Sequence, residues 1–320
     1  MKSKIYITGA AGFIGFHTTK KLLNKGIEVH GFDSMNNYYD IKLKKARLNI
    51  LKDFKKFSFT KAKLENKKSL ERIFNRFKPK VVIHLAAQAG VRYSIDKPRV
   101  YLESNITGSY NIIEVSKKYN VVHLIMASSS SVYGANTKIP FKEIDKTETQ
   151  LSIYASTKKS NESLAHSYSN IWKIPITMLR FFTVYGPWGR PDMALFKFTK
   201  GILNNKKIDI YNNGKNLRDF TYIDDVSKIL IKSINKKIYN KTLNICRSNP
   251  ILTNKLIQLL ILNYSNKKKI KLKKIDFVEG EVLKTHGSNK NLKKIFKNLI
   301  FTDIKKGIKN TVKSFKINNA

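Results

Sequence analysis

Three regularly spaced glycines near the start of the chain restrict what its first residues can form. Gly9, Gly12 and Gly15 stand between the apolar run Ile5 to Thr8 and a helical pattern from Phe13 to Asn24. Glycine permits a tight turn and a close backbone approach, and the N-terminus of a helix offers free N–H groups and a positive dipole end. Many strand–helix turns contain glycine, but this spacing is typical of dinucleotide sites. The pattern therefore predicts a pyrophosphate-binding turn.

Apolar strand-like runs alternate with amphipathic helical patterns along much of the chain, which indicates a parallel sheet covered by helices. The expected strands are Ile5 to Thr8, Ile27 to Asp33, Phe57 to Thr60, Val81 to Leu85, Val121 to Ala127 and Ile176 to Phe181, and one expected helix runs from Val100 to Tyr119. From Phe182 onward the pattern breaks into loops and short strands. We therefore predict an α/β fold with a doubly wound, Rossmann-type sheet in residues 1–180 and a smaller substrate lobe in residues 181–320. The helical pattern at 224–234 is expected to pack back on the first domain.

An acidic residue, Asp33, ends the second expected strand. A carboxylate at this position accepts hydrogen bonds from both hydroxyls of an adenosine ribose and repels a 2′-phosphate. The sequence therefore favours NAD over NADP as the cofactor. The alternative is that Asp33 is only a turn residue.

A tyrosine and a lysine four residues apart, Tyr154 and Lys158, follow a strand that ends in a run of serines. On a helix the two side chains share one face, and an ammonium beside a phenol helps it to act as a general base. Ser129, Ser130 and Ser131 stand where ligands bind in open parallel sheets, and their hydroxyls can donate to a sugar oxygen. Such pairs also arise by chance, and serines also cap turns. Their order after a dinucleotide turn favours catalysis.

The chain is strongly basic, with 62 Lys and Arg against 22 Asp and Glu and a formal net charge of +40. Such an excess suggests a nucleic acid or an anionic membrane as partner. However, only 9 of the 62 cations are arginines, which recognise phosphates and base edges better than lysines do. The lysines are scattered from end to end. We interpret the charge as a solvated surface and expect no nucleic-acid partner.

Composition also limits the class of protein. Hydrophobic residues make up 42% of the chain, which rules out a wholly disordered protein. No apolar run approaches the roughly 20 residues that span a bilayer, so no membrane insertion is expected. The single cysteine, Cys246, cannot form an internal disulfide, and the histidines show no metal-ligand spacing. The expectation is a cytoplasmic globular protein without a metal site.

Four stretches of the chain carry a resemblance to a known family: HLAAQAGVRYS, ASSSSVYGANTKIPF, RFFTVYGPWGRPDMALFKFT and RDFTYIDD. With the glycine turn, they make the chain similar over nearly its whole length to the extended short-chain dehydrogenases/reductases. Among these it most resembles the nucleotide-sugar epimerases that act on UDP-glucuronate. The resemblance implies NAD-dependent 4-epimerisation of UDP-glucuronate to UDP-galacturonate through a 4-keto intermediate. It also implies a homodimer, since such enzymes commonly pair two helices from each subunit.

The same resemblance implies a role for each matching residue. Tyr154 is the expected base, Lys158 its electrostatic partner and Ser129 the donor to the sugar O4. The expected cofactor residues are Gly9, Gly12, Phe13, Ile14, Gly15, Asp33, Leu85, Ala86, Ala87, Asn105 and Lys158, and the expected substrate residues are Arg92, Ser130, Ser131, Thr183, Arg190, Arg218 and Glu281. The planar fork of Arg190 suits the uronate carboxylate. Asn105 can equally be bonded to neighbouring backbone, and Arg92 can equally be a helix cap.

Some positions narrow or complicate this interpretation. Ser130 and Ser131 stand where sugar dehydratases or decarboxylases carry acidic residues, so reversible oxidation at C4 is favoured over those reactions. Lys63 and Ser288 stand where the relatives carry aspartates that accept hydrogen bonds from nucleotides. Two alternatives stay open. One is epimerisation of a neutral or N-acetylated UDP-hexose, and the other is a basic dinucleotide-fold protein that binds nucleic acid.

Overall fold

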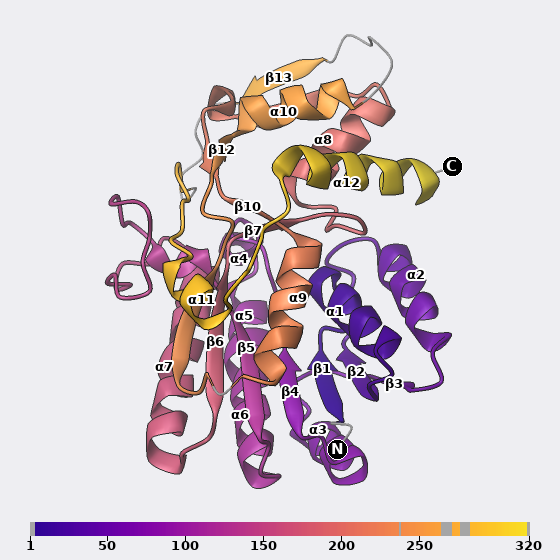
Figure 1. Ribbon diagram of the computed structural model, residues 1–320, viewed down its shortest axis with the longest axis vertical. Coiled ribbons are helices and arrows are strands. Elements are labelled where there is room, and N and C mark those ends of the chain that lie inside the picture. The colour runs from indigo at the N-terminus through magenta and orange to yellow at the C-terminus, as the bar shows by residue number, and fades with distance from the viewer. Residues whose placement is uncertain (1–3, 237, 264–270, 276–281, 319–320) are drawn as a thin grey trace.

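A seven-stranded parallel sheet forms the core of the computed structural model, which describes residues 4–236, 238–263, 271–275 and 282–318 (Figure 1). Its strands are β1 (Ile5–Thr8), β2 (Val29–Asp33), β3 (Phe57–Lys61), β4 (Val81–His84), β5 (His123–Ser129), β6 (Ile176–Phe181) and β11 (Lys241–Ile245). They lie side by side in the order β11-β6-β5-β4-β1-β2-β3. The strand order reverses between β1 and β4, where open parallel sheets bind their ligands. The predicted doubly wound α/β fold of the Rossmann type is confirmed.

Helices connect these strands, and shorter strands pair outside the main sheet. The helices are α1 (Phe13–Asn24), α2 (Ile41–Lys52), α3 (Lys67–Phe77), α4 (Tyr93–Asp96), α5 (Pro98–Tyr101), α6 (Gly108–Lys118), α7 (Ile153–Trp172), α8 (Ala194–Leu203), α9 (Ile223–Ile234), α10 (Thr253–Leu262), α11 (Lys290–Ile295) and α12 (Ile304–Asn318). A π-helical segment, η1 (Leu102–Thr107), joins α5 to α6, and two 3₁₀ turns are η2 (Ser130–Tyr133) and η3 (Asn212–Gly214). The short pairs are β7 (Thr183–Tyr185) with β10 (Phe220–Tyr222), β9 (Leu217–Arg218) with β12 (Ile251–Leu252), and β8 (Ile208–Tyr211) with β13 (Leu272–Ile275).

Side chains alternate across the sheet, and different helices bury its two faces. Ile5 and Ile7 of β1 join a buried cluster with apolar residues of α1 and α9. Tyr6 points to the other face, where it joins residues of α3, α6 and α7 and meets Phe74 edge-on at a ring-centroid distance of 4.9 Å. Both faces of the sheet are therefore removed from water, as a parallel sheet requires.

Elements from the second half of the chain return to the main sheet. Strand β11 pairs in parallel with β6 at the edge of the sheet. Helix α9 packs on α1, and the Lys21 ammonium lies 2.6 Å from a carboxylate oxygen of Asp224 there. Helices α8 and α10 and strand β13 lie instead at the top of Figure 1, beyond the carboxyl ends of the main strands. The two regions of the chain thus interleave and face each other across those ends.

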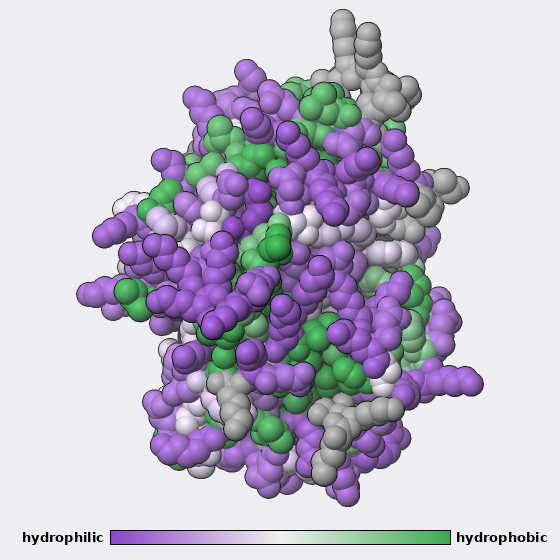
Figure 2. Space-filling model, in the orientation of Figure 1, coloured by the Kyte–Doolittle hydropathy of each residue, from purple (hydrophilic) through white to green (hydrophobic). Residues whose placement is uncertain are grey.

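One expected helix differs from the structure. The pattern from Val100 to Tyr119 predicts a continuous helix, but a π-helical segment interrupts the α-helix between Tyr101 and Gly108. Hydrophobic periodicity carries no sign of such a bulge, and π-bulges are frequent at functional sites. Among the residues described, none of the helices has the length and apolar character needed to cross a bilayer. Hydrophilic side chains cover most of the face seen in Figure 2.

Candidate active site

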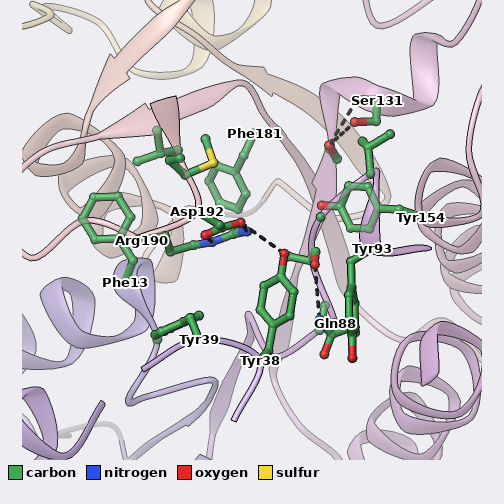
Figure 3. Close-up of a pocket in the computed structure, with 18 of the residues that line it drawn as sticks. Phe13, Tyr38, Tyr39, Gln88, Tyr93, Ser131, Tyr154, Phe181, Arg190 and Asp192 are labelled. Carbon is green, nitrogen blue, oxygen red and sulfur yellow. Dashed lines mark hydrogen bonds and ion pairs between the residues drawn. The ribbon is translucent and has the colours of Figure 1, made fainter. Parts of the chain in front are cut away.

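A cavity of about 1150 Å³ lies at the carboxyl ends of the main strands, between the sheet and the later elements (Figure 3). Its wall gathers nearly every residue that the sequence singles out: Gly9, Gly12, Phe13, Ile14, Gly15, Asp33, Leu85, Ala86, Ala87, Arg92, Ser129, Ser130, Ser131, Tyr154, Lys158, Thr183, Arg190 and Arg218. Folding therefore brings the glycine turn, the serines, the Tyr/Lys pair and three arginines to one place.

The glycine turn has space for a ligand but none for side chains of its own. Gly9 has a φ of +72°, a left-handed backbone that residues with a Cβ rarely adopt. A Cβ on Gly15 would lie 2.0 Å from the Gly9 carbonyl oxygen, so α1 packs this closely against the end of β1 only because residue 15 has no side chain. No side chain caps the first N–H groups of α1. These N–H groups, at the positive end of the helix, fit the pyrophosphate of a dinucleotide.

Asp33 lines the cavity at the end of β2 and is fixed by the backbone. Its Oδ2 accepts from the Ala11 N–H at 3.2 Å, and its Oδ1 accepts from the Met35 N–H at 2.8 Å. Burial raises the pKa of the Asp33 carboxyl, and the Lys44 ammonium acts in the opposite direction. Each carboxylate oxygen keeps a lone pair for another donor. The site thus fits the ribose hydroxyls that NAD presents at this position.

Tyr154, Lys158 and Glu162 follow one another at four-residue steps on α7, so their side chains share one face of the helix. The Lys158 Nζ donates to the carbonyl oxygen of Ala127 at 2.9 Å, which ties it to the end of β5. Burial lowers the pKa of Lys158 to about 8, and the Glu162 carboxylate partly offsets this effect. The ammonium therefore stays charged at neutral pH, in the wall of the cavity at the end of β5.

The Tyr154 phenol points into the cavity toward the serine run (Figure 3). Burial raises the pKa of Tyr154, whereas a hydrogen bond with Ser129 and the charge of Arg190 lower it. The Ser129 hydroxyl also accepts from the Ser131 N–H at 3.1 Å and lies 3.1 Å from the Ser131 hydroxyl. A phenol and a serine hydroxyl that meet in this way can share one substrate oxygen, the phenol as base and the serine as donor.

Arg190 enters the cavity from the side opposite Tyr154, on the loop after β7 (Figure 3). Its Nε donates to Oδ1 of Asp192 at 3.0 Å, and its Nη2 donates to Oδ2 of the same carboxylate. Oδ2 also accepts from the Tyr38 hydroxyl at 3.2 Å. The cation that the sequence assigns to a substrate carboxylate is therefore already paired within the protein.

The loop that carries Arg190 is anchored to the cofactor side of the cavity. Arg47 of α2, which is fully buried, donates to two carbonyl oxygens of loop 187–189 and, at 3.1 Å, to that of Ala11 in the glycine turn. Burial lowers the pKa of His17 to about 4, so its neutral ring donates from Nε2 to the Pro187 carbonyl oxygen at 2.8 Å. The glycine turn and the loop therefore share one buried guanidinium.

Two further arginines and a threonine line the cavity. The Arg92 guanidinium lies 4.0 Å from the ring centroid of Tyr211 on β8, so the first half of the chain touches the lobe here. The Nη1 of Arg218 on β9 donates to the carbonyl oxygen of Leu283 at 2.9 Å. Thr183 begins β7, with its hydroxyl-bearing side chain in the same wall. Guanidinium groups so placed suit an anionic ligand.

Asn105 lies behind the cavity wall, fully buried within η1. Its Oδ1 accepts from the Gln88 N–H at 2.7 Å, and its Nδ2 donates to the Gln88 carbonyl oxygen and the Thr157 hydroxyl, both at 3.0 Å. The alternative role, bonding to neighbouring backbone, thus describes its contacts. Asn105 connects the loop after β4 to the helix that carries Tyr154.

The positions that depart from the family pattern lie in different surroundings. Lys63 lines the cavity after β3. Ser288 is not part of the described wall, and its N–H donates to the Phe141 carbonyl oxygen at 2.8 Å. Glu281 lies outside the described residues. In the part of the chain that the structure describes, no group of three His, Cys, Asp or Glu side chains could hold a metal ion.

Three polar residues of the site escape the sequence analysis. Glu162 carries a signal, because it stands one turn after Lys158 and because a charge within the apolar strand β6, Arg180, needs a buried partner. Asp192 follows Arg190 by two residues, a spacing too common to indicate a pair. Tyr38 meets Asp192 across 154 positions of the chain, a contact that only the fold reveals.

Known proteins match this chain along most of its length. The NAD dependent epimerase/dehydratase family matches residues 5–246. Protein CapI of Staphylococcus aureus is 56% identical over 233 residues, which cover 73% of this chain and 70% of that protein. The UDP-glucuronate 4-epimerase of Thermodesulfobacterium geofontis (strain OPF15) is 41% identical over 307 residues, which cover 96% and 94%. The crystal structure of UDP-glucuronic acid 4-epimerase from Bacillus cereus, in complex with UDP-glucuronic acid and NAD, has a TM-score of 0.92 at 31% identity and covers 98% of this chain and 99% of that one. This chain belongs to the NAD dependent epimerase/dehydratase family.

Proposed function

We propose that this protein interconverts UDP-glucuronate and UDP-galacturonate by NAD-dependent epimerisation at C4. The observation that carries the proposal is a single cavity that contains the glycine turn, the Tyr154/Lys158 pair and a guanidinium, that of Arg190. The likeness to the UDP-glucuronate 4-epimerases of Thermodesulfobacterium geofontis and Bacillus cereus supports the same reaction. Residues 1–180 would hold NAD and residues 181–320 the nucleotide sugar.

The residues of the cavity divide the work of the reaction. Tyr154 removes the proton of the C4 hydroxyl while Ser129 donates a hydrogen bond to the same oxygen. Bound NAD supplies a hydride acceptor that afterwards serves as the hydride donor. The charge of Lys158 stabilises the phenolate. The 4-keto sugar then has to present its opposite face, and a cavity of about 1150 Å³ leaves room for it to turn. Tyr154 finally returns its proton to O4.

Arg190 is the residue that we assign to the uronate carboxylate, assisted by the hydroxyls of Thr183, Ser130 and Ser131. A guanidinium binds a carboxylate through charge-assisted, often bidentate hydrogen bonds. The 4-keto form of a uronate is a β-keto acid, which loses carbon dioxide when its carboxylate bond aligns with the carbonyl π system. A clamp on the carboxylate thus protects the intermediate as well as selecting the substrate.

Incubation of the purified, NAD-loaded protein with UDP-glucuronate, followed by separation of the two epimers, tests the proposal. Wild-type protein should form UDP-galacturonate, and Tyr154→Phe should lower kcat by at least about a hundredfold while UDP still binds. No interconversion by the NAD-loaded wild type would reject the function.

A neutral UDP-hexose is the second candidate, because the Arg190 charge is already balanced by Asp192. A neutral sugar would leave that ion pair undisturbed. A panel of UDP-glucuronate, UDP-glucose and UDP-N-acetylglucosamine, each assayed for its epimer, separates the candidates. The higher kcat/KM identifies the substrate.

The assembly and location of the protein belong to the same proposal. We infer a cytoplasmic homodimer that serves polysaccharide biosynthesis and pairs through α6 and α7. These helices expose Tyr110, Ile171 and Trp172 to 40%, 64% and 47%. Exposed apolar groups on neighbouring helices favour an isologous contact. Light scattering tests this inference, and a mass equal to the 36.9 kDa of one chain would contradict it.

A further inference from the structure

The guanidinium of Arg190 is held from one side by a single carboxylate. Asp192 accepts from both Nε and Nη2, so it fixes the plane of the group as well as its position. The exposed fractions of the two side chains are 24% and 27%, and both line the cavity. Because a guanidinium has five N–H donors, this contact leaves the Nη1 donors for a second acceptor.

Asp192 is itself held by Tyr38. The hydroxyl of Tyr38 donates to Oδ2 at 3.2 Å, the oxygen that also accepts from Nη2 of Arg190 (Figure 3). Burial, together with the Asp192 charge, raises the pKa of Tyr38 to about 12, so the hydroxyl keeps its proton and donates throughout the working pH range. Burial also raises the pKa of the Asp192 carboxyl, but Arg190 outweighs this effect and the pKa is lowered. The chain Tyr38, Asp192, Arg190 is therefore donor, anion and cation at neutral pH.

The order of these groups across the cavity defines which side stays open. Asp192 lies directly against the guanidinium, and the hydroxyls of Tyr38 and Tyr154 both lie to the right of this pair in Figure 3, with the Tyr154 phenol farther from it. The charge of Arg190 lowers the pKa of Tyr154, although burial of the phenol has the larger, opposite effect. For a sugar whose C4 hydroxyl reaches Tyr154, the donors of Arg190 that its carboxylate can use are those on Nη1, because Asp192 accepts from Nε and Nη2.

We propose that Asp192 and Tyr38 are positioning residues that set the angle of the Arg190 guanidinium and, through it, the angle of the substrate carboxylate. This inference rests on the proposed function, in which Arg190 binds that carboxylate. Neither residue touches the substrate in this scheme. Their effect is on which product forms.

The angle matters because the 4-keto uronate has a competing reaction. If the C5–C6 bond lies parallel to the carbonyl π orbitals, that bond breaks, its electron pair forms the enolate at C4, and carbon dioxide leaves. A proton from water then adds at C5, and return to C4 of the hydride that the cofactor took up in the oxidation gives a UDP-pentose. A carboxylate held near the carbonyl plane cannot reach this geometry. Loss of the positioning residues should therefore raise the share of UDP-pentose.

Two variants and a control test the inference. Asp192→Asn keeps the shape of the side chain but removes its charge, and Tyr38→Phe removes one hydroxyl and no charge. Asp53→Asn makes the same change as the first variant at an exposed position after α2. Each full-length, NAD-loaded protein is incubated with UDP-glucuronate, and UDP-galacturonate and UDP-pentose are separated by anion-exchange chromatography. The ratio of pentose to galacturonate should rise about tenfold in Asp192→Asn and about threefold in Tyr38→Phe, and should stay constant in the control.

A binding measurement separates this inference from the proposed function. In calorimetric titrations Tyr38→Phe should weaken UDP-glucuronate binding about threefold, because the Arg190 guanidinium is less well positioned for the carboxylate. UDP-glucose has no carboxylate and the variant retains every charge, so its binding should be unchanged. A wild type that forms no UDP-galacturonate rejects the function, and the titration alone then decides the positioning role. Wild-type product ratios and wild-type affinities in both variants would overturn it. Melting curves establish that the variants are folded, and Tyr38→Phe decides the matter if Asp192→Asn unfolds.

Discussion

Lys158 combines full burial with a charge that the chemistry needs. Its pKa is lowered to about 8 by burial, and the carboxylate of Glu162 limits the shift. In the proposed reaction the ammonium supports the Tyr154 phenolate below that pH, and above it the support disappears. Lys158 would thus set an upper pH limit for the proposed base.

We therefore predict that kcat/KM for UDP-glucuronate falls as the pH rises through about 8. Glu162→Gln removes the charge that holds the Lys158 pKa up, so the descending limb should move to lower pH. A pH profile of both proteins, recorded well below their melting temperatures, measures the shift. Superimposable alkaline limbs would show that Glu162 has no influence on the ammonium.

Arg190→Ala tests the carboxylate contact directly. We expect the KM for UDP-glucuronate to rise by about 10- to 100-fold, because one charge-assisted contact is lost, with the affinity for UDP itself unchanged. Steady-state kinetics and a UDP titration of the same preparation give both values. Unchanged kinetics would remove Arg190 from the site and favour the neutral sugar.

Single residues were predictable where a motif names them and unpredictable where only a contact does. Tyr154 and Lys158 are four residues apart, a spacing that places two side chains on one face of a helix, and both do lie on one face of α7. Asp192 and Tyr38 have no such spacing, because the bond between them closes a long loop of chain. Physical reasoning on a sequence finds periodic pairs far more easily than it finds contacts between loops.

At the scale of elements, a buried ion pair joins α7 to β6. The Arg180 guanidinium lies 2.8 Å from Glu162, and both side chains are at most 5% exposed. The Ser128 hydroxyl at the end of β5 also donates to Glu162 at 2.6 Å. The helix that presents Tyr154 is thus fixed to two strands of the sheet by a single carboxylate.

Removing one partner of this ion pair should lower the free energy of unfolding much more than replacing both partners with apolar residues. Glu162→Ala leaves a buried guanidinium without its partner, and we expect the free energy of unfolding to fall by about 3–5 kcal/mol. The double variant Glu162→Leu with Arg180→Met should recover much of that loss, since neither charge remains buried. Urea denaturation at constant pH measures all three proteins. Equal losses in the single and double variants would contradict this account.

A histidine links the stability of the β2–β3 pair to pH. His30 on β2 bonds the hydroxyls of Ser58 and Thr60 at 2.7 and 3.0 Å. Burial, with a smaller effect from Arg76, lowers the pKa of His30 to about 4. The unfolded chain takes up a proton near pH 6.5 that the folded chain refuses until about pH 4, so the folded state loses stability as the pH falls through this range.

His30→Gln isolates this effect because glutamine does not titrate. The stability advantage of the wild type over the variant should shrink by up to about 1.4 kcal/mol for each pH unit below 6.5. Urea denaturation at several pH values between neutrality and pH 4 measures the difference. An advantage that does not change with pH would mean that His30 takes up its proton at the same pH in the folded protein as in the unfolded chain.

The bounds of helices and strands were predictable to within a few residues where the hydrophobic periodicity ends at the position that a glycine also marks. Helix α1 has the bounds that its pattern predicts, Phe13–Asn24. The π segment η1 was missed; Asn105 within it bonds to Gln88 and Thr157, which lie outside the segment and are not neighbours in the sequence. Tertiary contacts decide such local departures, and a periodic pattern does not contain them.

At the scale of the whole molecule, the charge of +40 is the least ordinary property. Hydrophilic side chains cover most of the visible face in Figure 2, and the apolar patches between them are small and separated. A protein with this excess of cations attracts polyanions without sequence specificity, through counterion release. The fold explains none of this charge, and the cavity uses only a few of the cations.

We predict that the protein binds heparin in a strongly salt-dependent way and binds a UDP resin in a way that salt affects less. Elution from both resins over one salt gradient compares the two interactions. Retention on the UDP resin should persist at salt concentrations that empty the heparin column. Retention on heparin alone would support the nucleic-acid alternative.

The overall fold was predictable because parallel sheets need helical crossovers, which the alternating patterns display. The last strand of the main sheet, β11, was not predictable. It follows β6 by a long stretch of chain that lies outside the main sheet, so its pairing with β6 is non-local. The position of the later elements over the strand ends depends on the same non-local pairing of β11 with β6.

Arg47 has a consequence for how the two ligands influence each other. It donates to the turn that would bind NAD and to the loop that carries Arg190, so a change in either reaches the other through one rigid group. Coupling between two binding sites is reciprocal. If bound NAD lowers the free energy of binding the sugar acid by ordering the loop, the bound sugar acid lowers the free energy of binding NAD by the same amount. The protein would then bind its cofactor most tightly while the sugar is in the site. Loss of the cofactor at that stage would leave the 4-keto sugar without a hydride donor.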